Sequence, residues 1–318
     1  IGTDGEYVEV TSFRTEGTYS DARHPDKVSF TDKLDDDLSR RDFTCNAMAM
    51  DADGNIIDFF GGQEDIKNKI IRSVGKPDMR FSEDALRILR AVRFAAQCDF
   101  EIDKNTLDCA NKLACNLRFI SGERIFAEIS RTLSCPACNK VLSKTLPVFL
   151  SIFPSLKAEH WEKAVSQISL TGGSVCLSLA CILQYCDFLK ELKKLKSDSK
   201  TKNTVLFLLT NTLKNETDIR KKIGVFGFDN VLLLGRFITV TTNKNDNTLL
   251  DKILSCKDKL CSVTQLALSG NDVKALGIKG KSIALALDFL LVACIEKKCV
   301  NEHSELLNFL EKSIHLFK

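Results

Sequence analysis

Apolar side chains recur at helical spacing over residues 82–97. The apolar positions are Ala85, Leu86, Ile88, Leu89, Val92, Ala95 and Ala96. This spacing predicts an amphipathic helix with one face in a hydrophobic core. We expect Ser82 to cap the first turn, with Glu83 and Asp84 where the helix dipole favours acids. The opposite side carries polar residues at steps of three: Asp84, Arg87, Arg90 and Arg93.

That polar row has two interpretations from the residues alone. An acid followed one turn later by arginines can form ordinary intrahelical ion pairs on a solvated face. The same arrangement can hold a flat polar group or an anion. The stretch by itself does not separate these interpretations.

Hydrophobic patterning divides the chain into a short mixed part and a long helical part. Before about residue 60 we expect strands at 6–13, 28–30 and 56–60, and we expect helices at 35–50 and 63–71. The later predicted helices are 82–97, 103–115, 121–134, 138–146, 158–168, 173–187, 188–196, 201–213, 216–224, 228–240, 247–260, 270–276, 280–297 and 301–315. The predicted class is therefore α+β, a small sheet with helices followed by an all-α remainder.

Composition narrows the class of protein. The chain has 318 residues, enough for two or three domains. No apolar run has the length of a membrane span and no signal peptide is recognisable, so we expect a cytoplasmic protein without a membrane partner. The 13 cysteines are scattered through apolar segments, as expected of small buried hydrophobes in a reducing compartment. No second CxxC accompanies Cys135 and Cys138, which disfavours a metal or redox role for that pair.

The charged residues indicate at most a local binding surface. The net charge of +3 is mild, so any nucleic-acid surface must be a local patch. Basic clusters occur at 190–202, 220–222 and 279–281, and each is more simply a solvated face than a ligand site. The most polar stretch, 241–248, is a candidate domain joint.

Six segments occur in an order that is more specific than any one of them. They are Tyr7–Gly17 with the 19–25 loop, Arg40-Arg41-Asp42-Phe43-Thr44-Cys45-Asn46-Ala47-Met48-Ala49, Asp58–Asp65 with Ile71–Gly75, Glu83-Asp84-Ala85-Leu86-Arg87, Gly122-Glu123-Arg124-Ile125, and Ser269–Gly280. In these segments the chain resembles the tRNA nucleotidyltransferases, the class II CCA-adding enzymes of the DNA polymerase β superfamily. The second and fourth segments match the family motifs RRDFT and EDxxR at the family's separation.

The resemblance implies a polymerase-β-like head followed by a helical neck, body and tail. We expect a partial head at 1–77, a base-recognising neck at 78–135, a body at 136–240 and a tRNA-binding tail at 241–318. Family members add C, C and A to the tRNA 3′ end from CTP and ATP, with Mg²⁺ as cofactor. The expected partners are the 3′ end and acceptor arm of tRNA, ATP and CTP; the sequence does not indicate an oligomeric state.

Addition without a nucleic-acid template requires the protein to recognise the base. Cytosine and adenine both present an exocyclic amine beside a ring-nitrogen acceptor. Asp84 can accept from the amine and Arg87 can donate to the ring nitrogen, whereas uracil and guanine would make both contacts repulsive. Glu83 either orients Arg87 or only favours the helix start, and Arg90 and Arg93 are candidates for triphosphate contacts.

The resemblance suggests roles for three further residues. Arg41 is expected to contact the nucleotide near its sugar or phosphate. Asp42 and Asn46 are expected to contact the ribose or to organise the loop that carries them.

The metal site is expected to be only partly present. By resemblance Glu9 is the third catalytic carboxylate and a metal ligand, and the other two come from an Asp-x-Asp after a Gly-Ser turn. The pairs Asp35/Asp37 and Asp51/Asp53 have the spacing but not the context. We therefore expect a piece of a longer enzyme that is inactive alone.

Three other functions remain open from the sequence. A bacterial poly(A) polymerase and a relative that adds only A or only CC share these motifs. A non-catalytic RNA-binding protein could also have kept the scaffold.

Overall fold

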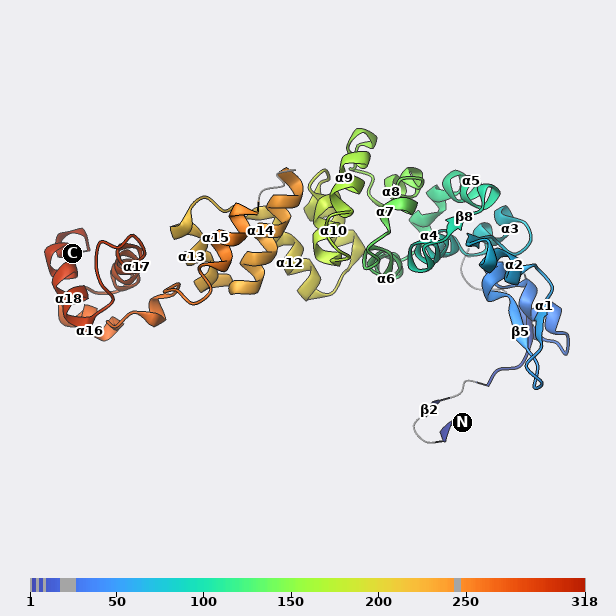
Figure 1. Ribbon diagram of the computed structural model, residues 1–318, viewed down its shortest axis with the longest axis horizontal. Coiled ribbons are helices and arrows are strands. Elements are labelled where there is room, and N and C mark those ends of the chain that lie inside the picture. The colour runs from blue at the N-terminus through green and yellow to red at the C-terminus, as the bar shows by residue number, and fades with distance from the viewer. Residues whose placement is uncertain (1, 4–5, 8–9, 18–26, 243–246, 318) are drawn as a thin grey trace. The chain divides into compact units, whose positions relative to one another are not determined.

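The computed structural model describes residues 2–3, 6–7, 10–17, 27–242 and 247–317. The chain forms two compact units, Ile1–Lys202 and Asn203–Lys318. Most described residues lie in helices and the strands are short (Figure 1), which confirms the predicted α+β class. No helix in the described part of the chain is both long and apolar enough to cross a membrane.

The strands of the first unit pair two by two. The pairs are β1 (Gly2–Thr3) with β2 (Glu6–Tyr7), β3 (Arg14–Glu16) with β4 (Val28–Phe30), β5 (Met48–Met50) with β6 (Ile56–Asp58), and β7 (Ile70–Ile71) with β8 (Glu101–Ile102). The first three pairs are antiparallel and the last is parallel. The parallel pair joins segments that are far apart in sequence, which local patterning could not reveal.

Two predicted helices in this region are wrong in extent. The helix expected over 35–50 is only α1 (Leu34–Ser39), and the chain later enters β5. The reason is a hairpin turn, in which Asp51 accepts hydrogen bonds from the N–H groups of Asp53 (3.0 Å) and Asn55 (2.8 Å). The helix expected over 63–71 is α2 (Gly62–Lys67), because the next apolar residues pair with β8.

The strand expected over 6–13 is also wrong in its second half. Residues 10–13 belong to no strand, and the next strand, β3, begins only at Arg14. β3 instead pairs with β4, the strand expected at 28–30. Glu9 lies outside the described residues.

Helices build the rest of the first unit. They are α3 (Pro77–Glu83), α4 (Leu86–Cys98), α5 (Lys104–Lys112), α6 (Gly122–Leu133), α7 (Asn139–Leu142), α8 (Leu146–Ile152), α9 (Trp161–Ile168), α10 (Val175–Leu183) and α11 (Phe188–Leu195). Helix α12 (Ser199–Thr210) follows and runs into the second unit. Helices α4 and α6 lie side by side (Figure 1), and Ile88, Leu89 and Val92 of α4 are buried. The predicted apolar stripe therefore is the core face of α4.

The helix predicted over 82–97 is broken at its start. Ser82 lies in the last turn of α3 and is not a cap, Asp84 is extended (φ −142°, ψ 107°), and α4 begins at Leu86. The break has a local cause: the Asp84 carboxylate accepts the Leu86 N–H at 2.9 Å, which satisfies one of the unpaired donors at a helix start.

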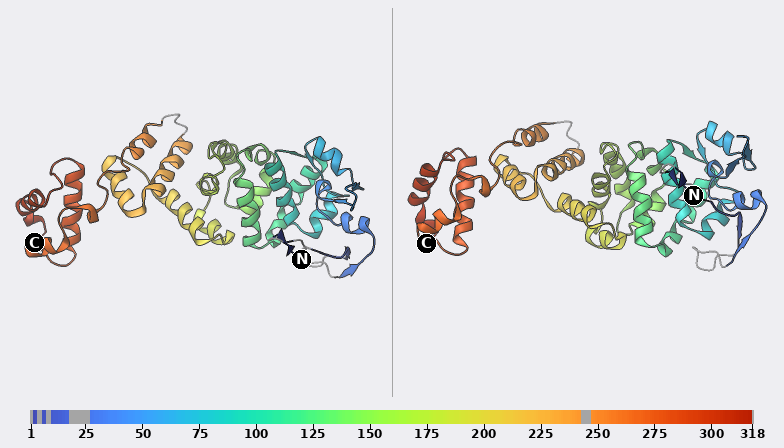
Figure 2. Two further views of the ribbon diagram at one scale, coloured as in Figure 1. Left: turned by 60° about the horizontal axis from the view of Figure 1, so that its bottom comes forward. Right: turned by 90° about the horizontal axis from the view of Figure 1, so that it is seen from below.

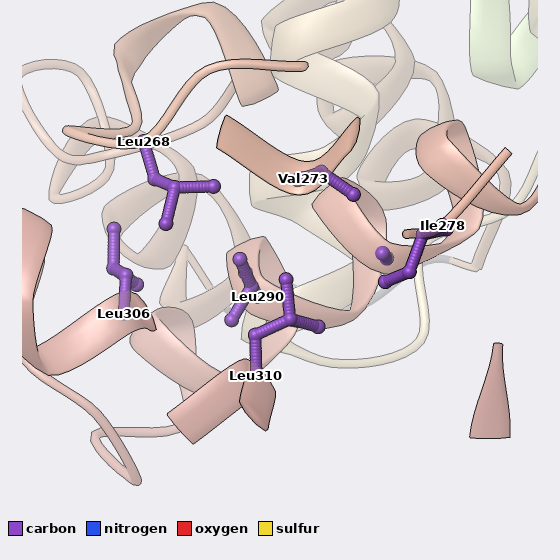
Figure 3. Packing of buried hydrophobic residues seen from close by; sticks show 7 residues of the cluster. Leu268, Val273, Ile278, Leu290, Leu306 and Leu310 are labelled. Atoms are coloured by element: carbon purple, nitrogen blue, oxygen red, sulfur yellow. The ribbon is translucent and has the colours of Figure 1, made fainter. Parts of the chain in front are cut away.

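The second unit has two buried clusters. Its helices are α13 (Glu216–Phe226), α14 (Phe228–Thr242), α15 (Thr248–Leu254), α16 (Gly270–Ala275), α17 (Ser282–Ile295) and α18 (His303–Lys312). One cluster joins α13, α14, α15 and the segment after α15, through Ile219, Ile223, Val231, Ile253, Cys256 and Cys261. The other contains Leu268, Val273, Ile278, Ala286, Leu290, Leu306 and Leu310 (Figure 3). The red C-terminal helices around it form one compact group in both views of Figure 2.

Candidate functional site

Asp84 occupies the junction between α3 and α4 and is held from two sides. One carboxylate oxygen, Oδ1, accepts the Leu86 N–H at 2.9 Å. The other, Oδ2, accepts Nη2 of Arg124 on α6 at 2.9 Å. Because both oxygens are engaged, the carboxylate has a defined orientation and still has acceptor capacity for a ligand donor.

Arg87 lies one turn after Asp84 and is mostly buried. Its Nη1 donates to Oε2 of Glu83 at 2.5 Å and to the carbonyl of Arg80 at 3.3 Å. Its Nη2 donates to the carbonyl of Arg40 at 3.0 Å, which ties α4 to the segment after α1. Glu83 is the last residue of α3 and does not begin a helix, so the interpretation that it only favours a helix start is wrong. Its carboxylate instead contacts the Arg87 guanidinium, as the alternative interpretation, that Glu83 orients Arg87, requires.

Asp42 links the first motif to α4. It is buried, and its Oδ2 accepts Nε of Arg90 at 2.6 Å. Its Oδ1 accepts the N–H of Phe43 at 3.0 Å and lies 3.5 Å from Nδ2 of Asn46. Asp42 thus organises its own loop and positions Arg90, while Asn46 lies beside it.

Arg41 is the most exposed of the expected contact residues in this cluster, with 44% of its side chain accessible. Its Nη1 donates to the Asn46 carbonyl at 3.2 Å, and its Nη2 lies 3.5 Å from Oδ2 of Asp37. Burial raises the pKa of Asp37, but hydrogen bonds from Arg40 and from the Arg14 N–H outweigh burial and lower it. Asp37 therefore stays ionised and anchors this part of the cluster.

Arg93 has a different environment. Its guanidinium is buried between α4 and α6, where Nε donates to Glu128 (2.6 Å) and Nη1 donates to Gln97 (2.7 Å). It also lies over the Phe94 ring at 4.0 Å. A buried, paired guanidinium is poorly placed to meet a triphosphate, so the surroundings of Arg93 favour a structural role over the phosphate contact suggested by the polar row.

The cluster as a whole carries an excess of positive charge. Its arginines are Arg40, Arg41, Arg80, Arg87, Arg90 and Arg124, and its carboxylates are Asp37, Asp42, Glu83 and Asp84. Six cations face four anions, which favours an anionic ligand. In addition, Nε of Arg80 and Nη1 of Arg124 are buried without a hydrogen-bond partner among the described residues. The cluster therefore has donors to offer.

Three arginines of this cluster were not assigned a role from the sequence: Arg40, Arg80 and Arg124. Arg124 stands in the Gly-Glu-Arg-Ile segment, which was the available signal. The sequence contained no signal for Arg80 or for the carbonyl of Arg40, because their contacts depend on how the helices end and pack.

Gly122 explains why α6 can carry Arg124 to this place. A Cβ atom at Gly122 would lie 2.0 Å from the carbonyl oxygen of Lys194, so glycine permits the start of α6 to approach the end of α11.

Gly122→Ala is therefore expected to destabilise the protein by roughly 1–3 kcal/mol, because backbone must move. Gly270 is the matched control: it also opens a helix, but its Cβ would meet only Cγ2 of Ile283 at 3.6 Å. Urea unfolding of the two variants checks this, and equal midpoint shifts would contradict the close-approach argument.

Among the described residues, no group of three or more His, Cys, Asp or Glu side chains could hold a metal ion. Asp37 is paired with Arg40, and Asp51 accepts the N–H groups of its own turn. Burial raises the pKa of the Cys138 thiol to about 11, so it is a core side chain with little thiolate character. The described residues do not fit a metal centre.

Two family models match the chain. The model of the "Poly A polymerase head domain" matches residues 1–72. The model of the "Probable RNA and SrmB- binding site of polymerase A" matches residues 99–159. The residues between these two matches include α3, all of α4 and the junction between them, and thus both Asp84 and Arg87.

Several curated and solved proteins are similar over most of the chain. A CCA-adding enzyme of Geobacillus sp. (strain WCH70) is 35% identical over 282 residues, covering 85% of this chain and 70% of the relative. A CCA-adding enzyme of Streptococcus mutans is 33% identical over 330 residues, covering 98% of this chain and 80% of the relative. The crystal structure of the Bacillus stearothermophilus CCA-adding enzyme in complex with CTP has a TM-score of 0.78 at 27% identity, covering 98% of this chain and 80% of that one. With identity of this level over most of both sequences, the chain belongs to the CCA-adding enzyme family of nucleotidyltransferases.

Proposed function

We propose that the chain selects CTP and ATP for addition of C and A to the tRNA 3′ end, and that Asp84 and Arg87 recognise the base. One observation carries the base selection. Two side chains of opposite character stand one turn apart at the α3–α4 junction, and each is held by its own partner, Arg124 for Asp84 and Glu83 for Arg87. Groups that are oriented before a ligand arrives lose little on binding.

The chemistry of the bases supports this assignment. A carboxylate accepts from the exocyclic amine of cytosine or adenine, and a guanidinium donates to the adjacent ring nitrogen. In uracil and guanine a carbonyl would face Asp84 and a ring N–H would face Arg87. A site with oriented polar groups rejects such partners strongly, because its own groups would be left unpaired.

We propose Arg41 and Arg90 for the sugar and phosphate side of the nucleotide. Arg41 is 44% exposed and Arg90 is 35% exposed, so both keep part of the guanidinium at the surface. Asp42 positions Arg90, and Asn46 supports Arg41 through its carbonyl. Arg93 is assigned to holding α4 on α6.

Mg²⁺ is the proposed cofactor, since nucleotidyltransferases of this family use a divalent metal. Glu9, outside the described residues, is the proposed ligand and catalytic carboxylate within this chain, and two further carboxylates are expected elsewhere in the enzyme. The metal would activate the attacking 3′-hydroxyl and offset charge on the leaving pyrophosphate.

We propose that the helical remainder binds tRNA. The Thermotoga maritima CCA-adding enzyme in complex with tRNA has the same fold, with a TM-score of 0.63 at 21% identity. The proposed division is a head at 1–77, a neck at 78–135, a body at 136–240 and a tail at 241–318. Basic clusters in body and tail would contact phosphates. A cytoplasmic location is proposed with this role.

Nucleotide binding to the chain tests the base selection without requiring catalysis. Titration calorimetry with CTP, ATP, UTP and GTP should give roughly hundredfold or greater preference for CTP and ATP. Similar affinities for all four nucleotides would contradict the proposal. Sequencing the products that the complete enzyme makes on tRNA lacking CCA separates CCA addition from poly(A), A-only or CC-only addition.

A further inference from the structure

Arg80 lies on α3, one turn before Glu83, and its side chain reaches that carboxylate. Nη1 of Arg80 donates to Oε2 of Glu83 at 2.9 Å. The same oxygen accepts Nη1 of Arg87 at 2.5 Å. One carboxylate oxygen is therefore shared by two guanidinium groups, and only one of them belongs to the residue assigned to the base.

The backbone of Arg80 contacts both base-recognising residues. Its carbonyl accepts Nη1 of Arg87 at 3.3 Å and the N–H of Asp84 at 3.4 Å. Arg80 is thus joined to Glu83 by its side chain and to Asp84 and Arg87 by its main chain.

The Arg80 side chain also has an unfavourable feature. The side chain is mostly enclosed, and its Nε is buried without a hydrogen-bond partner in the described part of the chain. A buried donor without a partner is unfavourable for folding. The contact that the guanidinium does make is the ion pair with Glu83.

We propose that Arg80 is a positioning residue for base selection, which holds Glu83 so that Glu83 sets the orientation of the Arg87 guanidinium. Two cations around one carboxylate also leave one positive charge, so Arg87 is not neutralised by its own orienting partner. Without Arg80, Glu83 is able to rotate and to pair with Arg87 alone. This inference rests on the proposed base recognition by Arg87.

Arg80→Ala is expected to lower the ratio of CTP to UTP affinity about tenfold, the order expected for losing one hydrogen bond between charged groups. Calorimetric titration of the full chain with each nucleotide measures the ratio. Arg80→Lys should restore part of it, because an ammonium can still reach Glu83. Arg118→Ala is the control, since Arg118 is exposed and stacks on Phe119.

A double-mutant cycle separates positioning from structure. Because Arg80 acts through Glu83, Arg80→Ala should add little to the loss of selectivity caused by Glu83→Gln. Additive losses would overturn the inference, and so would an equal loss of CTP and UTP affinity, which indicates contact with a part common to both nucleotides.

The Arg87→Ala variant distinguishes failure of this inference from failure of the proposed function. If Arg87→Ala removes selectivity while Arg80→Ala leaves it intact, the role of Arg80 is wrong and base recognition stands. If neither variant changes selectivity, base recognition by Arg87 is wrong as well. If circular dichroism shows that Arg80→Ala does not fold, the CTP-to-UTP affinity ratios of Arg80→Gln and Arg80→Lys provide the same test.

Discussion

Arg87→Ala is expected to abolish the preference of this chain for CTP over UTP and for ATP over GTP. The guanidinium donates to Glu83 and to the carbonyls of Arg80 and Arg40, so its plane is set before a nucleotide arrives. Removing it takes away donors to the ring nitrogen of the correct base and the repulsion toward the ring N–H of the wrong one. Affinity for CTP should fall, and affinity for UTP should stay the same or rise.

The expected loss in the CTP-to-UTP affinity ratio is roughly a hundredfold, because hydrogen bonds to a charged group contribute about 1.5–3 kcal/mol each. Calorimetry on the wild-type chain and the variant measures it. Arg87→Lys keeps the positive charge but lacks the planar guanidinium with its paired donors, so it should recover only part of the selectivity. Arg118→Ala should behave as wild type, and an unchanged ratio in Arg87→Ala would refute the assignment.

Arg93→Ala is expected to have the largest effect on stability. The Arg93 and Glu128 side chains are only 8% and 7% exposed, and they join α4 to α6 at 2.6 Å. Deleting the arginine leaves a buried carboxylate whose remaining ion-pair partner, Arg131, is 4.0 Å away and largely exposed. Breaking a buried pair in this way costs about 3–5 kcal/mol. Urea unfolding followed by circular dichroism should show a large decrease in midpoint.

A paired replacement separates structure from ligand contact at this position. Arg93→Met combined with Glu128→Leu removes both charges and should recover most of the stability, because apolar residues of similar volume often replace a buried ion pair without loss. The double variant should also bind CTP as wild type does. A stable double variant with strongly weakened CTP binding would restore the triphosphate contact that the spacing of Arg93 suggested.

The sequence alone determined the features that depend on neighbours along the chain. The apolar stripe of residues 85–96 predicted the core face of α4, since residues three and four apart share one side of a helix. Ile88 and Leu89 are indeed nearly inaccessible. The order of motifs likewise indicated the family, and the row that begins at Asp84 indicated the site that we propose for base recognition.

Only the tertiary structure decided how that row is used. The predicted helix is interrupted at Asp84, whose carboxylate caps α4 and pairs with Arg124 40 residues away in sequence. Arg90 is paired with Asp42, and Arg93 is withdrawn into the core with Glu128. Spacing along a helix gives the angle at which a side chain leaves the axis. Which partner it meets depends on the packing of other helices against that face, and helix–helix packing is non-local.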